Sequence, residues 1–103
     1  MKLLTREIEK KLPDLYSQEA KKPEEVKVIA KFFDPMGSWT WYATEYNKEQ
    51  GLFFGFVRGM DNELGYFSLL DLESVGKNRI LGIERDLHFG FNHTLVEVMQ
   101  EVL

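Results

Sequence analysis

The chain of 103 residues contains no cysteine, has only three prolines and has no long uninterrupted run of apolar residues. The absence of cysteine excludes disulfide bonds, cysteine-ligated zinc or iron–sulfur centres and thiol catalysis. The first eleven residues mix apolar with charged side chains, so they lack the apolar stretch of about 7 to 15 residues that a secretory signal needs. No window approaches the roughly 18 apolar residues of a membrane-spanning helix. We therefore expect a soluble, cytoplasmic protein with no membrane association.

The residues that are present suit one folded domain. Hydrophobic residues make up 44% of the chain and aromatic residues 14%, and the length predicts a single domain over residues 1–103. The charge is uneven, because residues 1–31 hold eight basic and six acidic side chains, whereas residues 32–103 hold five basic and eleven acidic ones. The net charge of −4 therefore understates the acidity of the aromatic-rich part of the chain. Such a surface repels phosphate, which argues against a nucleic acid as the partner.

Three segments carry the local signals of short helices. Thr5 is a predicted N-cap, and the helix that it begins ends before Pro13. Ser68 begins a second helix, and Gly76 stands where a left-handed residue would end it. Thr94 and Glu97, spaced as in a capping box, begin a third helix near the end of the chain. The apolar residues that these helices are expected to turn toward the core are Leu4, Ile8, Leu12, Leu69, Leu72, Leu95, Val98, Met99 and Val102, with Leu70 as a further candidate.

Four segments rich in aromatic and β-branched residues predict strands at residues 26–33, 38–46, 52–57 and 64–67. Short turns separate them, so neighbouring strands are antiparallel, because parallel neighbours would need long crossovers. The predicted fold class is α+β: a single domain with an antiparallel meander sheet of about four strands and two or three short helices. Residues 77–91 give no clear prediction. The residues of the first strand that are expected to share one face are Val26, Val28, Ala30 and Phe32.

Two tryptophans on one predicted strand suggest a binding surface. Trp39 and Trp41 are two residues apart, so on a strand they share a face with Glu45, and Tyr42 and Tyr46 take the opposite face. If exposed, the indoles would form an aromatic platform for a ligand or a partner protein. If covered by a helix, they would roof the core. A strand that is bulky on both faces needs a cover on each, and a homodimer or a partner protein would supply the second.

The acidic side chains show no recognised catalytic or metal-binding pattern. Glu45, Glu84 and Asp86 are candidates for general acid–base groups or hard-metal ligands, but the D-x-D and E-x-x-H spacings of nucleases and hydrolases are absent. The alternating charges of Glu84-Arg85-Asp86 fit either an ion-pair network at an interface or an exposed loop. We predict no catalytic residue, no metal and no cofactor.

Four ordered motifs, spread over nearly the whole chain, carry a family resemblance. They are LLTREIEKKLP at Leu3–Pro13, SWTWYATE at Ser38–Glu45, ELGYFSL at Glu63–Leu69 and IERDLHF at Ile83–Phe89. Together they resemble a domain-of-unknown-function family, number 2958, of small proteins from bacterial plasmids, integrative elements and phages. The resemblance implies a setting, since small accessory proteins of mobile elements often act on host or rival machinery.

The acidic, aromatic-rich sheet favours a non-enzymatic interaction protein that binds a host or rival protein. An anti-defence inhibitor of the anti-CRISPR or anti-restriction type is one form that this function could take. Two alternatives stay open: a small carboxylate-dependent or metal-assisted enzyme, and a homo-oligomeric structural module. The residues predicted to form the protein-binding surface are Trp39, Trp41, Tyr42, Glu45, Tyr66, Glu84, Arg85 and Asp86.

Overall fold

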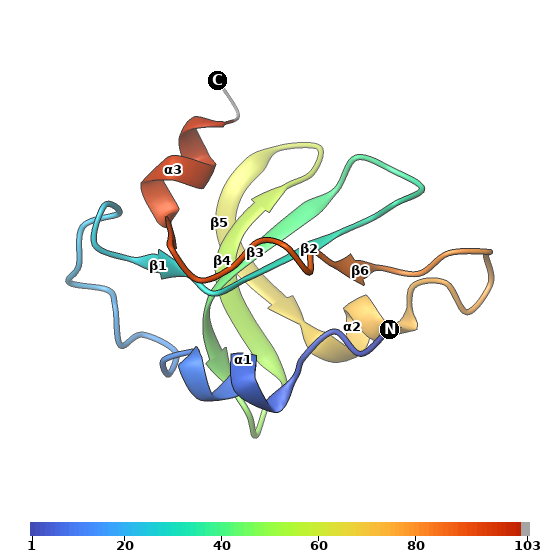
Figure 1. Cartoon of the computed structure of the whole chain (residues 1–103), viewed down its shortest axis with the longest axis horizontal. Helices are drawn as coiled ribbons and strands as arrows, with labels where there is room; N and C mark the ends of the chain where they lie inside the picture. Colours follow the sequence, from blue (N-terminus) through green and yellow to red (C-terminus); the bar gives the residue numbers. More distant parts are fainter. Residues whose placement is uncertain (102–103) are drawn as a thin grey trace.

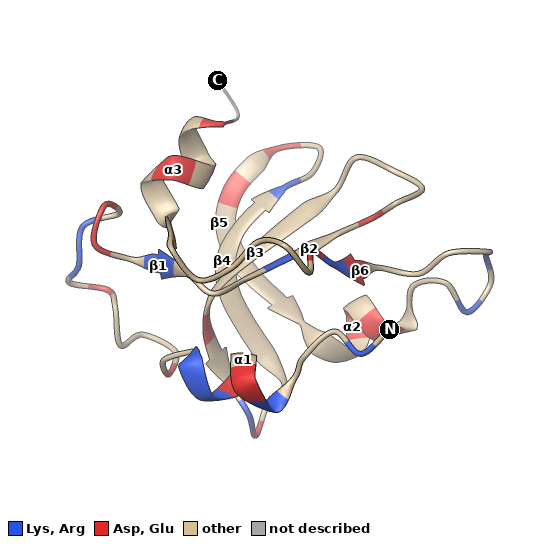
Figure 2. Cartoon of the chain, viewed as in Figure 1, with Lys and Arg blue, Asp and Glu red and all other residues tan. Residues whose placement is uncertain are grey.

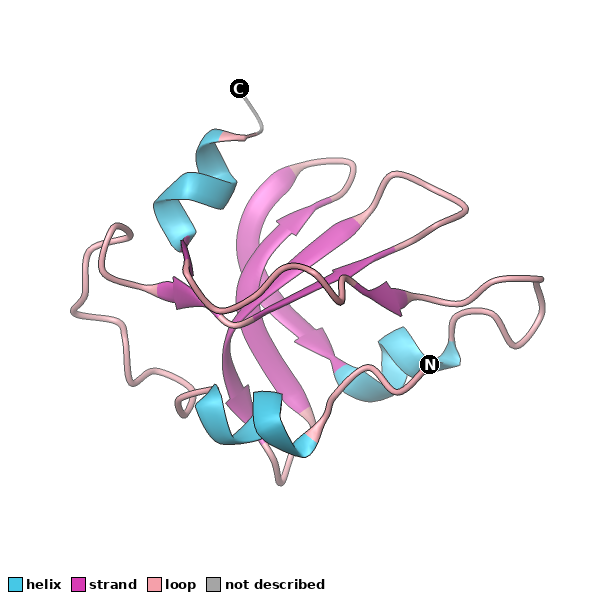
Figure 3. Cartoon of the chain, viewed as in Figure 1, coloured by secondary structure: helices cyan, strands magenta, loops and turns pink. Residues whose placement is uncertain are grey.

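The computed structural model describes residues 1–101 and shows an α+β fold built on a twisted antiparallel sheet (Figures 1 and 3). The sheet has five strands in the order β5-β4-β3-β2-β6, and a separate two-stranded ribbon joins β1 to β7. Among the helices of the described residues, none is long and apolar enough to span a membrane. The strands are β1 (Lys27–Val28), β2 (Ala30–Phe33), β3 (Thr40–Asn47), β4 (Leu52–Arg58), β5 (Asn62–Ser68), β6 (Glu84–Arg85) and β7 (His93–Thr94).

Three short helices surround the sheet: α1 (Arg6–Lys11), α2 (Leu69–Ser74) and α3 (Leu95–Gln100). All three begin as the sequence predicts, because the hydroxyl group of each N-cap accepts a hydrogen bond from the backbone N–H three residues later. Gly76, two residues past the end of α2, has a φ of +99°, which glycine adopts without steric cost. Val102, expected on the apolar stripe of α3, lies outside the described residues.

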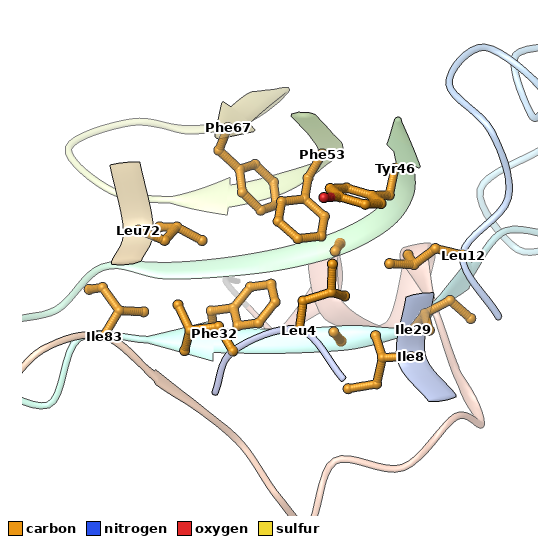
Figure 4. Close-up of a cluster of buried hydrophobic side chains, with 13 residues drawn as sticks. Leu4, Ile8, Leu12, Ile29, Phe32, Tyr46, Phe53, Phe67, Leu72 and Ile83 are labelled. Atoms are coloured by element: carbon orange, nitrogen blue, oxygen red, sulfur yellow. The ribbon is translucent and has the colours of Figure 1, made fainter. Parts of the chain in front are cut away.

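The sheet separates two hydrophobic cores. The first core lies under α1, α2 and the N-terminal segment, where the rings of Tyr46 and Phe67 flank Phe53 at centroid distances of 4.6 and 5.2 Å (Figure 4). The second core lies on the other face, under α3. The first core comprises Leu3, Leu4, Ile8, Leu12, Ile29, Ala30, Phe32, Ala43, Tyr46, Phe53, Phe67, Leu72 and Ile83. The second comprises Val26, Val28, Tyr42, Phe56, Leu95 and Val98.

The segment at residues 26–33 is not one strand with one buried face. β1 pairs with β7, and the chain then turns at Ile29, whose N–H donates to the carbonyl of Ala43 at 2.9 Å. β2 continues from Ala30 but pairs with β3 and β6 instead. Val26 and Val28 therefore enter the second core, while Ala30 and Phe32 enter the first. The change of partner between β1 and β2 explains why simple alternation does not hold here.

A β-bulge in β3 corrects the predicted faces of the aromatic strand. The pairing of β3 with β4 shifts between Ala43 and Glu45, so Thr44 is an extra residue. An extra residue reverses the faces of all residues beyond it. Glu45 therefore joins the face of Tyr42, and Tyr46 joins the face of Trp41 in the first core. The expectations that Glu45 shares the tryptophan face and that Tyr46 takes the opposite face were both wrong for this reason.

Candidate functional site

A cavity of about 240 Å³ opens on the sheet face that carries the second core. Its walls come from the loop after α1, from β3, β4 and β5, and from the first residue of α3. α3 contributes Leu95 to the lining, and β4 and β5 contribute Phe54, Leu64 and Tyr66. We call it the tyrosine cavity; its lining residues are Tyr16, Gln18, Glu19, Lys21, Pro23, Val26, Thr44, Glu45, Phe54, Leu64, Tyr66 and Leu95.

Exposed apolar side chains form the rim of the tyrosine cavity. Tyr16 is 59% exposed, Tyr66 is 50% exposed and Leu64 is 45% exposed. The ring of Tyr66 packs edge-on against Phe54 at 5.0 Å and against Tyr16 at 6.4 Å, measured between ring centroids. Such a cluster of exposed aromatic rings at a concave site is typical of surfaces that bind partners.

Glu45 is a buried carboxylate in the lining of the tyrosine cavity. Glu45 is only 5% exposed, and its two oxygens accept hydrogen bonds from the backbone N–H groups of Tyr16 at 2.8 Å and Gln18 at 3.1 Å. The side chain of Gln18 also donates to the carbonyl of Thr44 at 3.0 Å. The bulge at Thr44 thus turns the side chain of Glu45 toward the loop after α1, and these hydrogen bonds attach that loop to the sheet. Figure 2 shows how few charged residues the central strands carry.

Tyr16 holds an unusual backbone conformation at the rim. Its φ of +69° is left-handed, and within residues 1–101 no other residue except glycine has a positive φ. This conformation costs of the order of 1–3 kcal/mol for a non-glycine residue, and the hydrogen bond from its N–H to Glu45 helps to hold it. Hydrogen bonding with the Tyr16 side chain is the main cause that raises the pKa of Tyr66 to about 12. The phenol of Tyr66 is therefore neutral at physiological pH.

Trp39 and Trp41 lie away from the tyrosine cavity. Their ring centroids are 5.9 Å apart, Trp41 packs against the first core, and Trp39 is 40% exposed. The Trp39 ring lies so close to Gly59 that a Cβ there would come within 2.5 Å of it. Trp41 therefore fits the expectation of a ring that roofs the core, while Trp39 keeps an exposed edge. Binding at this second site stays a prediction.

The charged triplet after residue 83 has roles within the chain. Glu84 and Arg85 form β6, which pairs with β2 at the edge of the sheet. The guanidinium of Arg85 donates to the carbonyl groups of Lys2 and Leu3, and so anchors the N-terminal segment. Asp86 lies 3.9 Å from the ammonium group of Lys31. Arg85 thus clamps the N-terminal segment to the sheet edge within the chain. Its substitution would disturb the fold as well as any surface at which a partner binds.

The three carboxylates considered for catalysis do not share a cavity. Glu45 lines the tyrosine cavity, Glu84 lines a groove beside α2, and Asp86 lines the grooves on either side of β2. Within residues 1–101, no three His, Asp or Glu side chains are close enough together to hold a metal ion. In the described part of the chain, Glu45 therefore lines a different pocket from Glu84 and from Asp86.

Of the residues predicted to bind a partner, the tyrosine cavity contains only Glu45 and Tyr66. Tyr42 is fully buried in the second core, so the structure places it inside the protein instead of on a surface. Sequence reasoning missed Tyr16 and Leu64. Leu64 is two residues from Tyr66 and shares its strand face, which is a signal that alternation could have used. Tyr16 lies in a polar loop, where no spacing marks it.

Comparison with known proteins identifies the family of the chain. No curated protein and no solved structure matches the chain. A family with the description "Protein of unknown function (DUF2958)" matches residues 3–102, a range that includes all four motifs that carried the resemblance. The resemblance to this family is thereby confirmed, and the chain belongs to the DUF2958 family.

Proposed function

We propose that this chain is a non-enzymatic binding protein that holds a partner protein at the tyrosine cavity. The observation that carries the proposal is the pair of half-exposed tyrosines, Tyr16 and Tyr66, at the rim of a concave site of about 240 Å³. Aromatic side chains of this kind supply much of the binding energy in protein interfaces because they bury large areas with few rotatable bonds. A partner segment that covered this rim would bury Tyr16, Leu64 and Tyr66 together.

The charge of the surface supports a protein partner with basic groups. Residues 32–103 carry five basic and eleven acidic side chains, an excess of six negative charges. An acidic surface speeds association with basic surfaces and disfavours acidic ones. The setting implied by the family resemblance, a mobile element, would make the partner a host or rival protein. In that setting, inhibition of a defence system of the host is the form of the function that we propose.

Site-directed photo-crosslinking tests the proposed surface. A benzophenone amino acid replaces Tyr66 in one variant and Leu70 in a matched control, because Leu70 is 71% exposed on α2 and does not line the cavity. After irradiation in living cells, we expect a discrete adduct with one other protein from position 66 and none from position 70. Equal adducts from both positions, or none from position 66, would overturn the proposal. An adduct that contains two copies of this chain would favour the homo-oligomeric alternative.

A challenge assay tests the anti-defence form of the proposal. Cells with an active restriction or CRISPR system should admit more phage when they make the wild-type chain than when they make a Tyr66→Ala variant. If neither form changes phage entry under any such system, the anti-defence role is wrong, while the binding function is still judged by the crosslinking result.

A further inference from the structure

The carboxylate of Glu45 is buried but has no cationic partner in the described part of the chain. Contacts between basic and acidic side chains among residues 1–101 join Lys31 to Asp86, Lys48 to Glu9, Arg79 to Asp34 and His93 to Glu97, and none of them includes Glu45. A buried charge is costly unless it is paired or hydrogen-bonded. Two backbone N–H groups satisfy part of its hydrogen-bonding capacity, but a carboxylate offers about four acceptor positions.

Glu45 lines a cavity that also has aromatic walls. Phe54, Tyr16 and Tyr66 line the same cavity as Glu45, and Tyr66 lies within 6.4 Å of each of the other two rings, centroid to centroid. The faces of aromatic rings attract cations within about 6 Å of the ring centroid, most strongly where water is excluded. Glu19 adds a second carboxylate to the lining, against the single ammonium group of Lys21.

From this combination we infer that the tyrosine cavity takes a basic side chain, an arginine or lysine, of the partner. The charged end of that side chain pairs with the free acceptor positions of Glu45, and its apolar stem packs between Tyr66 and Tyr16. This inference rests on the proposed function and names the chemistry that the partner presents. Charge complementarity favours this occupant, because an acidic or neutral side chain would leave the buried carboxylate unpaired.

Short arginine and lysine compounds provide a direct test on the full chain. The probes are N-acetyl-arginine methylamide and N-acetyl-lysine methylamide, with the neutral N-acetyl-citrulline methylamide as the control of nearly equal shape. Binding is followed by the amide resonances of Tyr16 and Gln18 in ¹H–¹⁵N spectra, because their N–H groups bond directly to the Glu45 carboxylate. We expect both cationic probes to shift these resonances at concentrations about tenfold lower than citrulline does, the ratio that corresponds to about 1.4 kcal/mol. Equal binding of all three probes would overturn the inference.

Matched variants separate the charge from the fold. Glu45→Gln should abolish the preference for the cationic probes, whereas Glu63→Gln should not, since Glu63 is an exposed carboxylate on β5 that lies outside the cavity lining. If Glu45→Gln does not fold, Tyr66→Leu replaces it as the test, because Tyr66 is half exposed and its substitution is tolerated more easily. Tyr66→Leu should weaken the binding of the cationic probes, whereas Tyr66→Phe, which keeps the aromatic ring, should not. A cation preference that survives both Glu45→Gln and Tyr66→Leu would also overturn the inference.

The outcomes also distinguish this inference from the proposed function. If position 66 crosslinks to a partner but the probes show no preference for charge, the binding surface stands and the basic side chain is wrong. If position 66 gives no adduct, the proposed function fails whatever the probes show.

Discussion

Substituting alanine at Gly55 should strongly destabilise the fold, while the same change at Gly65 should not. The two glycines lie directly opposite each other on β4 and β5. A Cβ on Gly55 would lie 1.7 Å from the carbonyl oxygen of Tyr42 and 2.8 Å from its carbonyl carbon, whereas a Cβ on Gly65 would meet nothing within 4 Å. The pair therefore isolates one steric effect with a built-in control.

The magnitude follows from the atoms that would collide. The obstacle to Gly55→Ala is backbone of the central strand β3, so β3 and β4 would have to separate by roughly 1.3 Å to lengthen the contact from 1.7 Å to 3.0 Å. Overpacking of this kind costs about 1–3 kcal/mol, and two weakened ladder hydrogen bonds add about 1 kcal/mol each. We expect a loss of roughly 3–5 kcal/mol in the free energy of unfolding, which is a large part of the 5–15 kcal/mol typical of a domain. Gly65→Ala should be neutral or stabilising by up to about 1 kcal/mol.

Urea unfolding followed by tryptophan fluorescence measures both variants against the wild type. In a separate thermal scan, the melting temperature should fall by roughly 10 to 40 °C for Gly55→Ala, at about 4–8 °C for each kcal/mol. A loss of less than about 1 kcal/mol for Gly55→Ala, or an equal loss for both variants, would show that β3 and β4 do not approach as closely as described.

Three further predictions concern side chains at the cavity, the tryptophan site and the sheet edge. Tyr16→Phe should lower the pKa of Tyr66, followed by absorbance, from about 12 toward the ordinary value of 10, because it removes the phenol that raises this pKa. In the wild type, the raised pKa of Tyr66 contributes stability that is fully present below pH 10 and is lost as the pH rises through about 12. An unchanged titration would contradict the contact. Gly59→Ala should displace the Trp39 ring and change the tryptophan emission spectrum with little loss of stability, since Trp39 is 40% exposed. An unaltered spectrum would contradict the contact between Trp39 and Gly59. Arg85→Ala should lower the free energy of unfolding by about 1.5–3 kcal/mol, because it removes the charge-assisted hydrogen bonds of Arg85 to Lys2 and Leu3. A change below about 0.5 kcal/mol in urea unfolding would show that these hydrogen bonds do not stabilise the fold.

The parts of the fold that depend on neighbouring residues could be predicted from the sequence. The three helix starts were confirmed because an N-cap acts on an N–H group only three residues away. The meander was confirmed because short turns leave antiparallel pairing as the only choice for adjacent strands. Strand β6 was missed, because two charged residues show no alternation, and β6 exists only because the edge of β2 is free to pair with it.

The candidate site was harder to predict because distant residues build it. The hydrogen bonds that fasten the loop to Glu45 join residues 29 and 27 positions apart, and no local spacing encodes such contacts. The bulge at Thr44, which turns Glu45 toward the loop, has a glycine opposite it, Gly55 on β4, but no residue of β3 next to Thr44 has a turn preference that would fix its position. Tyr66 and Glu45 were predicted as binding residues from aromatic content and charge, but their meeting in one cavity depends on the bulge.

The clamp of Arg85 on the N-terminal segment has a consequence for the newly made chain. The carbonyl groups of Lys2 and Leu3 accept hydrogen bonds from Arg85, which lies 83 and 82 positions later in the chain. At about 5–20 residues per second, synthesis of that stretch takes roughly 4 to 16 s. Throughout this interval Leu3, which is almost fully buried in the finished protein, has no strand β6 to lock it in place. The first core therefore cannot close fully around Leu3 until β6 has been made, and this apolar side chain stays accessible to water until then.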